Sequence, residues 1–175
     1  MKIETICSGD WLSIKKIDDW YEYCHDEVCN GKGVAILGFK KIEDGTYRFV
    51  GRYENCPCHF DGITLTSLTG MVEEEKGDTI ESTAVKEMKE EAGIDITEDD
   101  LIYMGIVKES KMTDKKQYLF GVDVTDKEIN KSIGDGTEGE KGSYCAWVNI
   151  VEIVKSKDTL MPTIILRLIS YGYLE

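Results

Sequence analysis

Three glutamates stand at helical spacing in one short segment of the chain. Residues 78–94 read DTIESTAVKEMKEEAGI and contain Glu87, Glu90 and Glu91. Side chains three or four residues apart lie along one stripe of a helix. Like charges there destabilise a bare helix by roughly 0.2–0.5 kcal/mol per pair, so a fold that concentrates them usually places them beside a cation. Carboxylate oxygens suit Mg²⁺ or Mn²⁺, and we predict a metal site made by these three side chains.

The helix that carries the glutamates has defined ends in the sequence. Asp78 at the N-cap with Glu81 three residues later forms a D-x-x-E variant of the capping box, and Gly93 supplies the stop. A solvated acidic face is the alternative explanation for such a helix. The agreement of helix start, helix stop and a preceding strand that ends at Gly70 favours a functional site. Apolar residues that should pack on a sheet recur along another stripe: Ile80, Ala84, Val85, Met88 and Ala92.

The segment KEMKEEAGI, residues 86–94, resembles the signature of the Nudix hydrolases, R-E-hydrophobic-x-E-E-x-G-hydrophobic. Eight of the nine positions agree, which fixes three glutamates, a glycine and two apolar sites in one register. The resemblance implies an α/β (α+β) fold over residues 34–173, a Nudix-like α/β/α sandwich with a mixed β-sheet. It also implies that Glu87, Glu90 and Glu91 hold a metal for hydrolysis of a pyrophosphate bond in a nucleoside diphosphate linked to another group, by attack of water on phosphorus.

Two residues beside the glutamates depart from the family pattern. Lys86 stands where the family has Arg, and Asp78 stands where it has Glu. Both keep the charge of the family residue but change its reach and hydrogen-bond geometry. We expect Lys86 to orient a glutamate of the helix, or Asp78, rather than to touch the substrate.

The loop ahead of the helix also departs from the pattern. The family places a glycine six positions before the acidic residue, where this chain has Val72, and Gly70 lies two residues further back. The loop of residues 71–77 is therefore two residues longer. If Gly70 matches the family glycine, its carbonyl oxygen is an additional metal ligand; if the insertion has shifted it, that ligand is lost.

The general base has two candidate sources, because relatives use either a helix glutamate or a glutamate on a loop before a late strand. Glu138 and Glu140 fit the second description, since they lie in the glycine-rich residues 134–142 just before the apolar run 144–148. We predict that they are catalytic residues. A surface loop without a catalytic role is the alternative.

Substrate contacts outside the helix are expected at Arg52, which ends a strand and could clamp a phosphate. A charge in solvent, or paired with Glu54, is the alternative for this side chain. The N-terminal extension is similar to the layout of ADP-ribose pyrophosphatases, which dimerise through it, so ADP-ribose or another nucleotide sugar is favoured over a (d)NTP. Four aromatic residues of the extension either stack on a base or, as we expect, contribute to a homodimer interface: Trp11, Trp20, Tyr21 and Tyr23.

A different class of function is a catalytically weak Nudix-like module that senses or binds a nucleotide without cleaving it. Such modules can lose a metal ligand while they keep the fold. The retention of all three glutamates argues against this alternative.

Composition narrows the class of partner. The chain has 34 acidic and 21 basic residues, a net charge of −13, which opposes binding to nucleic acids and to acidic membrane surfaces. A small nucleotide substrate remains compatible because a bound divalent cation bridges carboxylate and phosphate. No apolar run is long enough to span a membrane and the first residues lack the layout of a signal peptide, so we expect a cytoplasmic protein.

The domain organisation is expected to be simple. With 175 residues and two prolines, residues 1–175 are predicted to form a single Nudix-like domain, with an N-terminal extension at 1–30 and the signature at 70–94. The six cysteines form no regular framework and are predicted to be reduced, with a zinc site as the alternative. Strands are predicted at 11–17, 18–23, 34–39, 47–53, 64–68, 101–108, 116–124 and 144–148, and helices at 78–93, 149–155 and 162–173.

Overall fold

The computed structural model describes residues 1–59, 62–130 and 142–175. The strands of this part of the chain are β1 (Ile3–Ser8), β2 (Leu12–Ile17), β3 (Tyr21–Asp26), β4 (Lys32–Lys41), β5 (Tyr47–Asn55), β6 (Ile63–Thr66), β7 (Leu68–Met71), β8 (Leu101–Lys108), β9 (Lys116–Asp123) and β10 (Tyr144–Val148). The helices are α1 (Ile80–Ala92), α2 (Ile150–Lys155) and α3 (Leu160–Ser170), with short 3₁₀ turns at Pro57–His59, Glu74–Lys76 and Glu98–Asp100.

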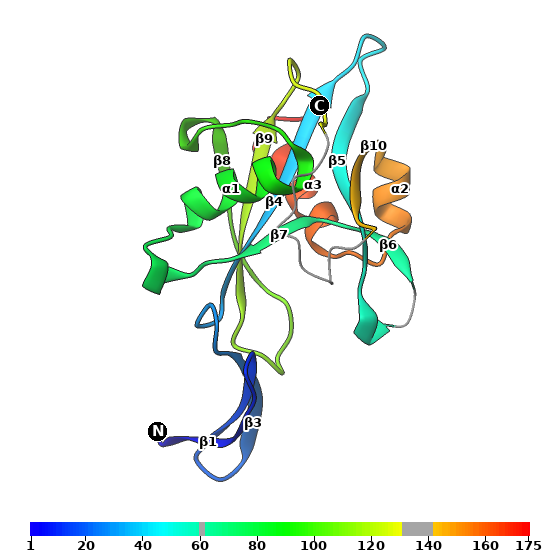
Figure 1. The fold of residues 1–175 in the computed structure, drawn as a ribbon. Helices are drawn as coiled ribbons and strands as arrows, with labels where there is room; N and C mark the ends of the chain where they lie inside the picture. The colour runs from blue at the N-terminus through cyan, green and yellow to red at the C-terminus, as the bar shows by residue number, and fades with distance from the viewer. Residues whose placement is uncertain (60–61, 131–141) are drawn as a thin grey trace.

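The body of the molecule is a mixed sheet of seven strands between helices. Its order is β10-β5-β4-β9-β8, with β6 on β5 and β7 on β4, and β4 runs parallel to β9. Helix α1 crosses one face, and α3 covers the other, as Figure 1 shows. The predicted α/β/α sandwich with a mixed sheet is confirmed, and no helix among the described residues is long and apolar enough to cross a bilayer.

Two apolar cores hold the layers together, one on each face of the sheet. Strand β4 is buried from Gly33 to Phe39 because its alternate side chains enter both cores. Ala84, Met88 and Ala92 of α1 are fully buried against Val34 and Ile36, which confirms the predicted apolar stripe of the helix. The other core joins the sheet to α2 and α3.

Helix α1 begins one residue later than predicted. Its N-cap is Thr79, whose hydroxyl accepts the Ser82 amide while the Ser82 hydroxyl accepts the Thr79 amide. The predicted cap made by Asp78 and Glu81 is therefore wrong: the reciprocal capping box is formed one position later in the chain. Gly93 ends the helix with φ of 64°, as predicted.

The strand predicted over residues 64–68 is two strands that separate at Ser67. Strand β6 pairs with β5, whereas β7 pairs with β4 and places Gly70 opposite Val34. The Ser67 amide and hydroxyl both donate to Asp158, which lies just before α3. This polar contact fixes the change of direction, and it brings the end of β7 under helix α1.

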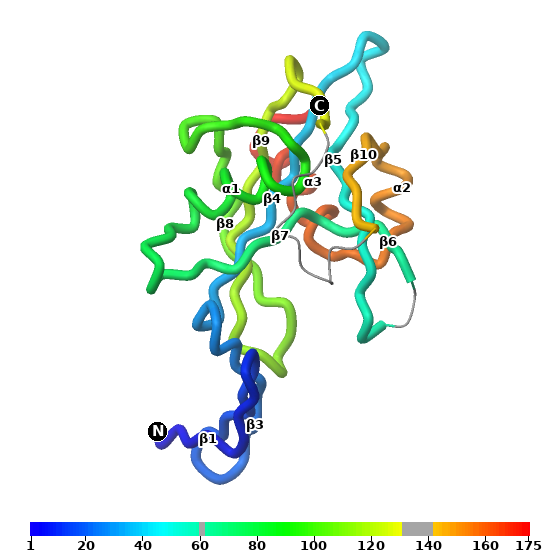
Figure 2. Tube along the Cα trace, in the orientation of Figure 1, coloured from blue at the N-terminus to red at the C-terminus, as the bar shows by residue number. Residues whose placement is uncertain are grey.

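The N-terminal residues form a separate three-stranded antiparallel sheet, β1-β2-β3, rather than the predicted strand pair. Figure 2 shows that this sheet projects from one end of the body. The loop before β9 connects the two parts: the Cys24 amide donates to the Met112 carbonyl, and His25 Nδ1 lies 2.7 Å from Asp114 Oδ2.

The strands and helices of the C-terminal half agree closely with the ranges predicted from the sequence. Strands β8 and β10 have the predicted bounds, and Asn149 caps α2 through the Val151 and Glu152 amides. Helix α3 starts before the predicted Pro162, because the Asp158 carboxylate accepts the Leu160 amide in the first turn. Proline is tolerated there, since the first turn does not need its N–H.

Candidate metal-binding site

Two of the three glutamates predicted as metal ligands lie close together beside strand β7. Glu87 and Glu91, four residues apart on α1, line one hollow of about 260 Å³ together with Gly70. The remaining lining residues are Thr69, Met71, Lys115 and Gln117. The helix brings the carboxylates to the sheet, and the β7–β4 pairing sets the position of Gly70 against them.

Gly70 is required for this approach. A Cβ atom at this position would lie 2.3 Å from Glu87 Oε1, far inside van der Waals contact. The absence of a side chain lets the carboxylate of Glu87 lie directly over the β7 backbone. The sequence left open whether Gly70 or a shifted residue occupies the family position, and the structure brings Gly70 to the glutamate.

Glu91 is held by a cation from the sheet. Arg52 of β5 is 5% exposed, and its guanidinium forms ion pairs with both Glu91 Oε1 and Glu54 Oε2. Glu54 in turn accepts a hydrogen bond of 3.0 Å from the Thr66 hydroxyl on β6. A polar chain therefore runs from Thr66 through Glu54 and Arg52 to Glu91.

The environment of Glu91 disfavours its charge. The pKa of Glu91 is raised to about 9: burial is the main cause, Arg52 opposes it, and the charges of Glu87 and Glu54 add to the rise. Glu91 Oε2 is buried and has no hydrogen-bond partner among the described residues. An unsatisfied acceptor in an acidic hollow is the environment that a bound cation would neutralise.

The residues present fit a hard divalent cation. The carboxylates of Glu87 and Glu91 offer oxygen atoms, the type of ligand that Mg²⁺ and Mn²⁺ prefer, and the Gly70 carbonyl ligand stays a prediction. Glu90 is partly buried on α1 but does not line the hollow. Within the described residues, no three Asp, Glu, His or Cys side chains lie close enough together to hold one ion, so the three-glutamate ligand set stays a prediction.

Lys86 contacts none of the glutamates in the described part of the chain, and its orienting role stays a prediction. Lys86 is exposed and forms no ion pair or hydrogen bond with the part of the chain that the structure describes, because its side chain leaves α1 on the solvent side. The Asp78 side chain likewise has no hydrogen-bond partner there. Arg52 forms ion pairs with Glu91 and Glu54, so its guanidinium is directed to two carboxylates rather than to solvent, and its contact with a substrate stays a prediction.

Four residues of the hollow were not predicted as site residues: Thr69, Met71, Lys115 and Gln117. Lys115 lies just before β9 and Gln117 lies within it, and Gln117 donates to Glu109 over 2.7 Å. Their distance in sequence from the glutamates left no spacing signal, although a buried polar residue at the start of an apolar strand is a usable clue. Glu138 and Glu140 lie outside the described residues, and their catalytic role stays a prediction.

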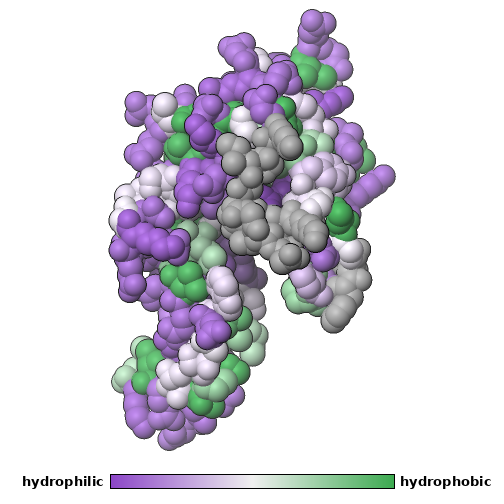
Figure 3. All heavy atoms as spheres, in the orientation of Figure 1, coloured by the Kyte–Doolittle hydropathy of each residue, from purple (hydrophilic) through white to green (hydrophobic). Residues whose placement is uncertain are grey.

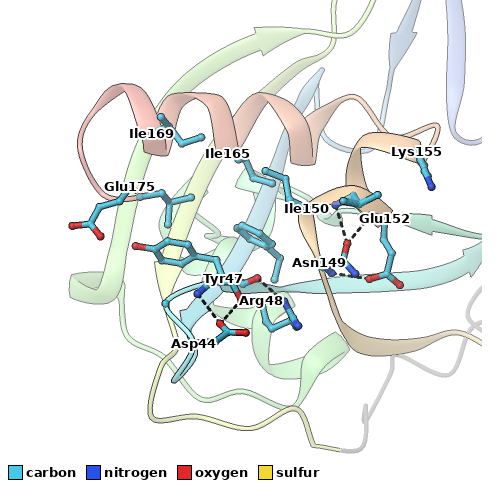
Figure 4. A pocket seen from close by; sticks show the side chains of 15 residues that line it. Asp44, Tyr47, Arg48, Asn149, Ile150, Glu152, Lys155, Ile165, Ile169 and Glu175 are labelled. Carbon is cyan, nitrogen blue, oxygen red and sulfur yellow. Dashed lines mark hydrogen bonds between the residues drawn. The ribbon is translucent and has the colours of Figure 1, made fainter.

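A larger hollow, of about 660 Å³, lies elsewhere, between the β4–β5 turn and helices α2 and α3 (Figure 4). Its walls are largely apolar, with Phe49 and Ile165 at the base. Its carboxylates already have partners, since Asp44 accepts from Thr46 and Glu152 accepts from the Asn149 amide. The smaller acidic hollow is therefore the candidate functional site.

Neither a family model nor a curated protein sequence matches the chain. Solved structures of other proteins do match the chain. A crystal structure of an ADP compounds hydrolase superposes with a TM-score of 0.68 at 14% identity, over 99% of this chain and 95% of that one. The NUDIX domain of Shewanella oneidensis NrtR, in complex with ADP ribose, gives 0.60 at 10% identity over 80% and 86%.

A third match is a MutT/nudix family protein from Enterococcus faecalis, with a TM-score of 0.53 at 11% identity, over 77% of this chain but only 46% of that protein. Taken together, these likenesses show the fold: the chain has the Nudix fold. The fold expected from the resemblance of residues 86–94 is confirmed.

Proposed function

We propose that the protein is a divalent-metal-dependent pyrophosphohydrolase that cleaves a nucleoside diphosphate linked to another group. The observation that carries the proposal is the convergence of Glu87, Glu91 and Gly70 on one hollow, where Glu91 Oε2 is buried without a partner. Such a group of hard oxygen atoms, in a fold shared with nucleotide hydrolases, supports binding of a metal and a pyrophosphate.

The reaction divides between the cation and the residues of the chain. When bound, Mg²⁺ or Mn²⁺ would neutralise the pyrophosphate and favour ionisation of the attacking water. The water oxygen bonds to one phosphorus, and the bridging P–O bond breaks with its electron pair left on the bridging oxygen. A carboxylate takes the proton of the water; the candidates are the helix glutamates, with Glu138 and Glu140 as predicted loop alternatives.

Arg52 contributes by fixing Glu91. Its guanidinium holds one oxygen of Glu91 and leaves Oε2 available to the hollow. Lys115, which lines the same hollow and lies 3.4 Å from Asp26, adds a positive charge beside the pyrophosphate position.

The names of the structural neighbours support the choice of substrate. One is an ADP compounds hydrolase that matches nearly the whole chain, and another was crystallised with ADP ribose. We favour ADP-ribose or a related nucleotide sugar, with a (d)NTP as the rival substrate.

The N-terminal sheet supports a homodimer as part of the proposal. Large apolar side chains stay exposed on and around it, among them Ile6 at 50%, Trp11 at 64% and Trp20 at 78%. Figure 3 shows apolar residues gathered at this end of the molecule. A second copy of the chain that covers them would remove this surface from water.

The test measures phosphate release, through a coupled phosphatase, from ADP-ribose, other nucleotide sugars, dinucleoside polyphosphates and (d)NTPs with Mg²⁺ or Mn²⁺. Glu87→Gln and Glu91→Gln should abolish turnover. Glu81→Gln, on the first turn of the same helix and outside the hollow, is the matched control and should retain it. Nucleotide binding without metal-dependent cleavage in the wild type would overturn the hydrolase and favour the sensing module.

A further inference from the structure

The loop that leads into β9 brings a lysine to the hollow of the glutamates. Lys115 lines this hollow together with Glu87 and Glu91, and it is the only cationic side chain among the described residues that line it. The Lys115 side chain is 24% exposed, so its ammonium group is largely withdrawn from water. The contacts that fix this side chain therefore decide where a positive charge stands beside a bound pyrophosphate.

The backbone on both sides of Lys115 is held by the end of β3 and by the turn that follows it (Figure 1). The Asp114 amide donates to the Cys24 carbonyl over 3.3 Å, and the Lys116 amide donates to the Gly31 carbonyl over 2.8 Å. The N-terminal part of the chain therefore sets the place from which the Lys115 side chain leaves the backbone.

Asp26, the last residue of β3, holds the side chain itself. Lys115 Nζ lies 3.4 Å from Asp26 Oδ2. The Asp26 side chain is only 10% exposed, and its other oxygen accepts the amides of Val28 and Cys29 over 3.1 and 3.2 Å. A carboxylate bound by two backbone amides of its own turn is a fixed acceptor, so it restricts the ammonium group that pairs with it.

We propose that Asp26 is a positioning residue for Lys115, and that Lys115 binds the pyrophosphate. The proposal rests on the proposed hydrolase and adds to it a residue of the N-terminal sheet. Asp26 does not line the hollow, so it acts on the substrate only through the lysine. A lysine that is already held in place loses less conformational freedom when it binds a phosphate.

The charge of Asp26 alone would have the opposite effect on substrate binding. A carboxylate near a bound pyrophosphate repels it, so removal of the negative charge should strengthen binding if charge is all that matters. If Asp26 positions Lys115, its removal should weaken binding instead. The sign of the change therefore separates the two explanations.

The test measures the affinity for α,β-methylene ADP, a diphosphate with a bridge that cannot be hydrolysed, by calorimetric titration with Mg²⁺. Lys115→Met should weaken binding at least tenfold through the loss of a charge-assisted contact. Asp26→Asn should weaken it about fivefold. Asparagine keeps an oxygen for the Val28 and Cys29 amides but presents an amide NH₂ to the ammonium group, so the turn is retained while Lys115 is released.

The double variant Asp26→Asn, Lys115→Met distinguishes positioning from a general effect on structure. It should bind the probe within twofold of Lys115→Met alone, because Asp26 acts only through the lysine. A further fivefold loss would overturn the proposal. Glu22→Gln is the matched control: it removes an ion pair with Lys16 inside the N-terminal sheet and should leave the affinity unchanged.

The outcomes separate this proposal from the hydrolase. Unchanged or stronger binding in Asp26→Asn overturns the positioning role even where the wild type hydrolyses its substrate. The weaker binding expected for Asp26→Asn supports it even where the wild type releases no phosphate, since the probe is not cleaved. A wild type that does not bind the probe overturns it as well.

Turnover adds a second measurement where the hydrolase assay succeeds. Asp26→Asn should raise KM about fivefold and change kcat by less than twofold, because Lys115 contacts the pyrophosphate before and during the reaction. A fall in kcat with an unchanged KM would overturn the proposal.

Discussion

The seven-stranded sheet and the N-terminal sheet are stabilised in different ways. Strand β4 of the body is buried from Gly33 to Phe39, whereas every residue of β1 is exposed. The body has helices on both faces, and no residue of the three N-terminal strands belongs to either apolar core of the described residues. Hydrophobic burial therefore accounts for the body, but it accounts for little of the N-terminal sheet.

Polar contacts at one edge hold the N-terminal sheet in place. His25 contacts Asp114, and Lys115 lies 3.4 Å from Asp26. Lys115 also lines the acidic hollow, so the junction of the two sheets borders the candidate site. The comparison indicates that changes in the body should affect folding and chemistry, and that changes in the N-terminal sheet should mainly affect association.

The largest expected difference is in stability, tested with two isoleucines. Ile36 on β4 is fully buried, and Ile3 on β1 is 50% exposed. Ile36→Ala should lower the free energy of unfolding by about 3 kcal/mol through lost burial and a cavity, whereas Ile3→Ala should change it by less than about 0.5 kcal/mol. Urea unfolding at low protein concentration measures both, and similar losses would contradict the comparison.

A pair of glycines tests where the chemistry lies. Gly70→Ala introduces a Cβ 2.3 Å from Glu87 Oε1, so the carboxylate must move. We expect kcat/KM to fall about a hundredfold, the effect of displacing a site group by about 1 Å. Gly9→Ala, where the nearest atom is 3.6 Å from the added Cβ, should leave kcat/KM unchanged. Retained activity in Gly70→Ala would remove this glycine from the site.

Glu91 of the body and Asp26 of the N-terminal sheet should make the free energy of unfolding depend on pH with opposite signs. Burial raises the pKa of Glu91 to about 9 from its ordinary 4.5, so without metal the folded chain keeps a proton that the unfolded chain loses. The free energy of unfolding should therefore fall as pH rises between about 4.5 and 9. Glu91→Gln should abolish this slope.

Asp26 in β3 should have the opposite effect on the pH dependence of the free energy of unfolding. Burial opposes its ionisation, but the Cys29 amide and thiol and the Lys115 ammonium group together lower the pKa of Asp26 below its ordinary 3.8. Ionised Asp26 stabilises the folded chain above about pH 4, and this stabilisation is lost as the pH falls through the pKa of Asp26 in the folded state. Asp26→Asn should therefore remove this fall in the free energy of unfolding. Chemical denaturation across pH measures both variants, and slopes of the same sign would contradict the assignment.

Binding of a cation should displace the proton of Glu91 at neutral pH. The proton held by Glu91 must leave when the carboxylate coordinates a cation, so close to one proton should be released at pH 7. Calorimetric titration of Mg²⁺ in two buffers with different ionisation enthalpies counts that proton. A titration without proton release would show that Glu91 is already ionised.

The sequence predicts the helix and its glutamates because their signals are local. The spacing of Glu87 and Glu91 and the stop at Gly93 depend on neighbours within one or two turns. The cap was misplaced by one residue because Asp78 and Thr79 are both good N-cap residues. Only the three-dimensional geometry shows that Thr79 and Ser82 form the reciprocal pair.

The partners of the site could not be predicted from the sequence because they are distant in the chain. The break at Ser67 depends on Asp158, 91 residues later, and no glycine or proline marks it. The pairing of Arg52 with Glu91 joins a strand to a helix, and periodicity within either element does not reveal it. Contacts of this kind are set by the packing of the sheet rather than by local propensity.

The last prediction concerns the proposed homodimer and should affect the folded monomer least. It tests directly whether the N-terminal sheet forms the dimer interface. Ile6 of β1 and Ile169 of α3 are exposed to similar degrees, 50% and 45%. If the N-terminal sheet forms the dimer, Ile6→Glu places a charge in the interface and should weaken the dimer at least tenfold, with little change in monomer stability. Ile169→Glu should leave the dimer intact. Sedimentation equilibrium measures both variants, and a dimer weakened only by Ile169→Glu would move the interface to the α3 face of the body.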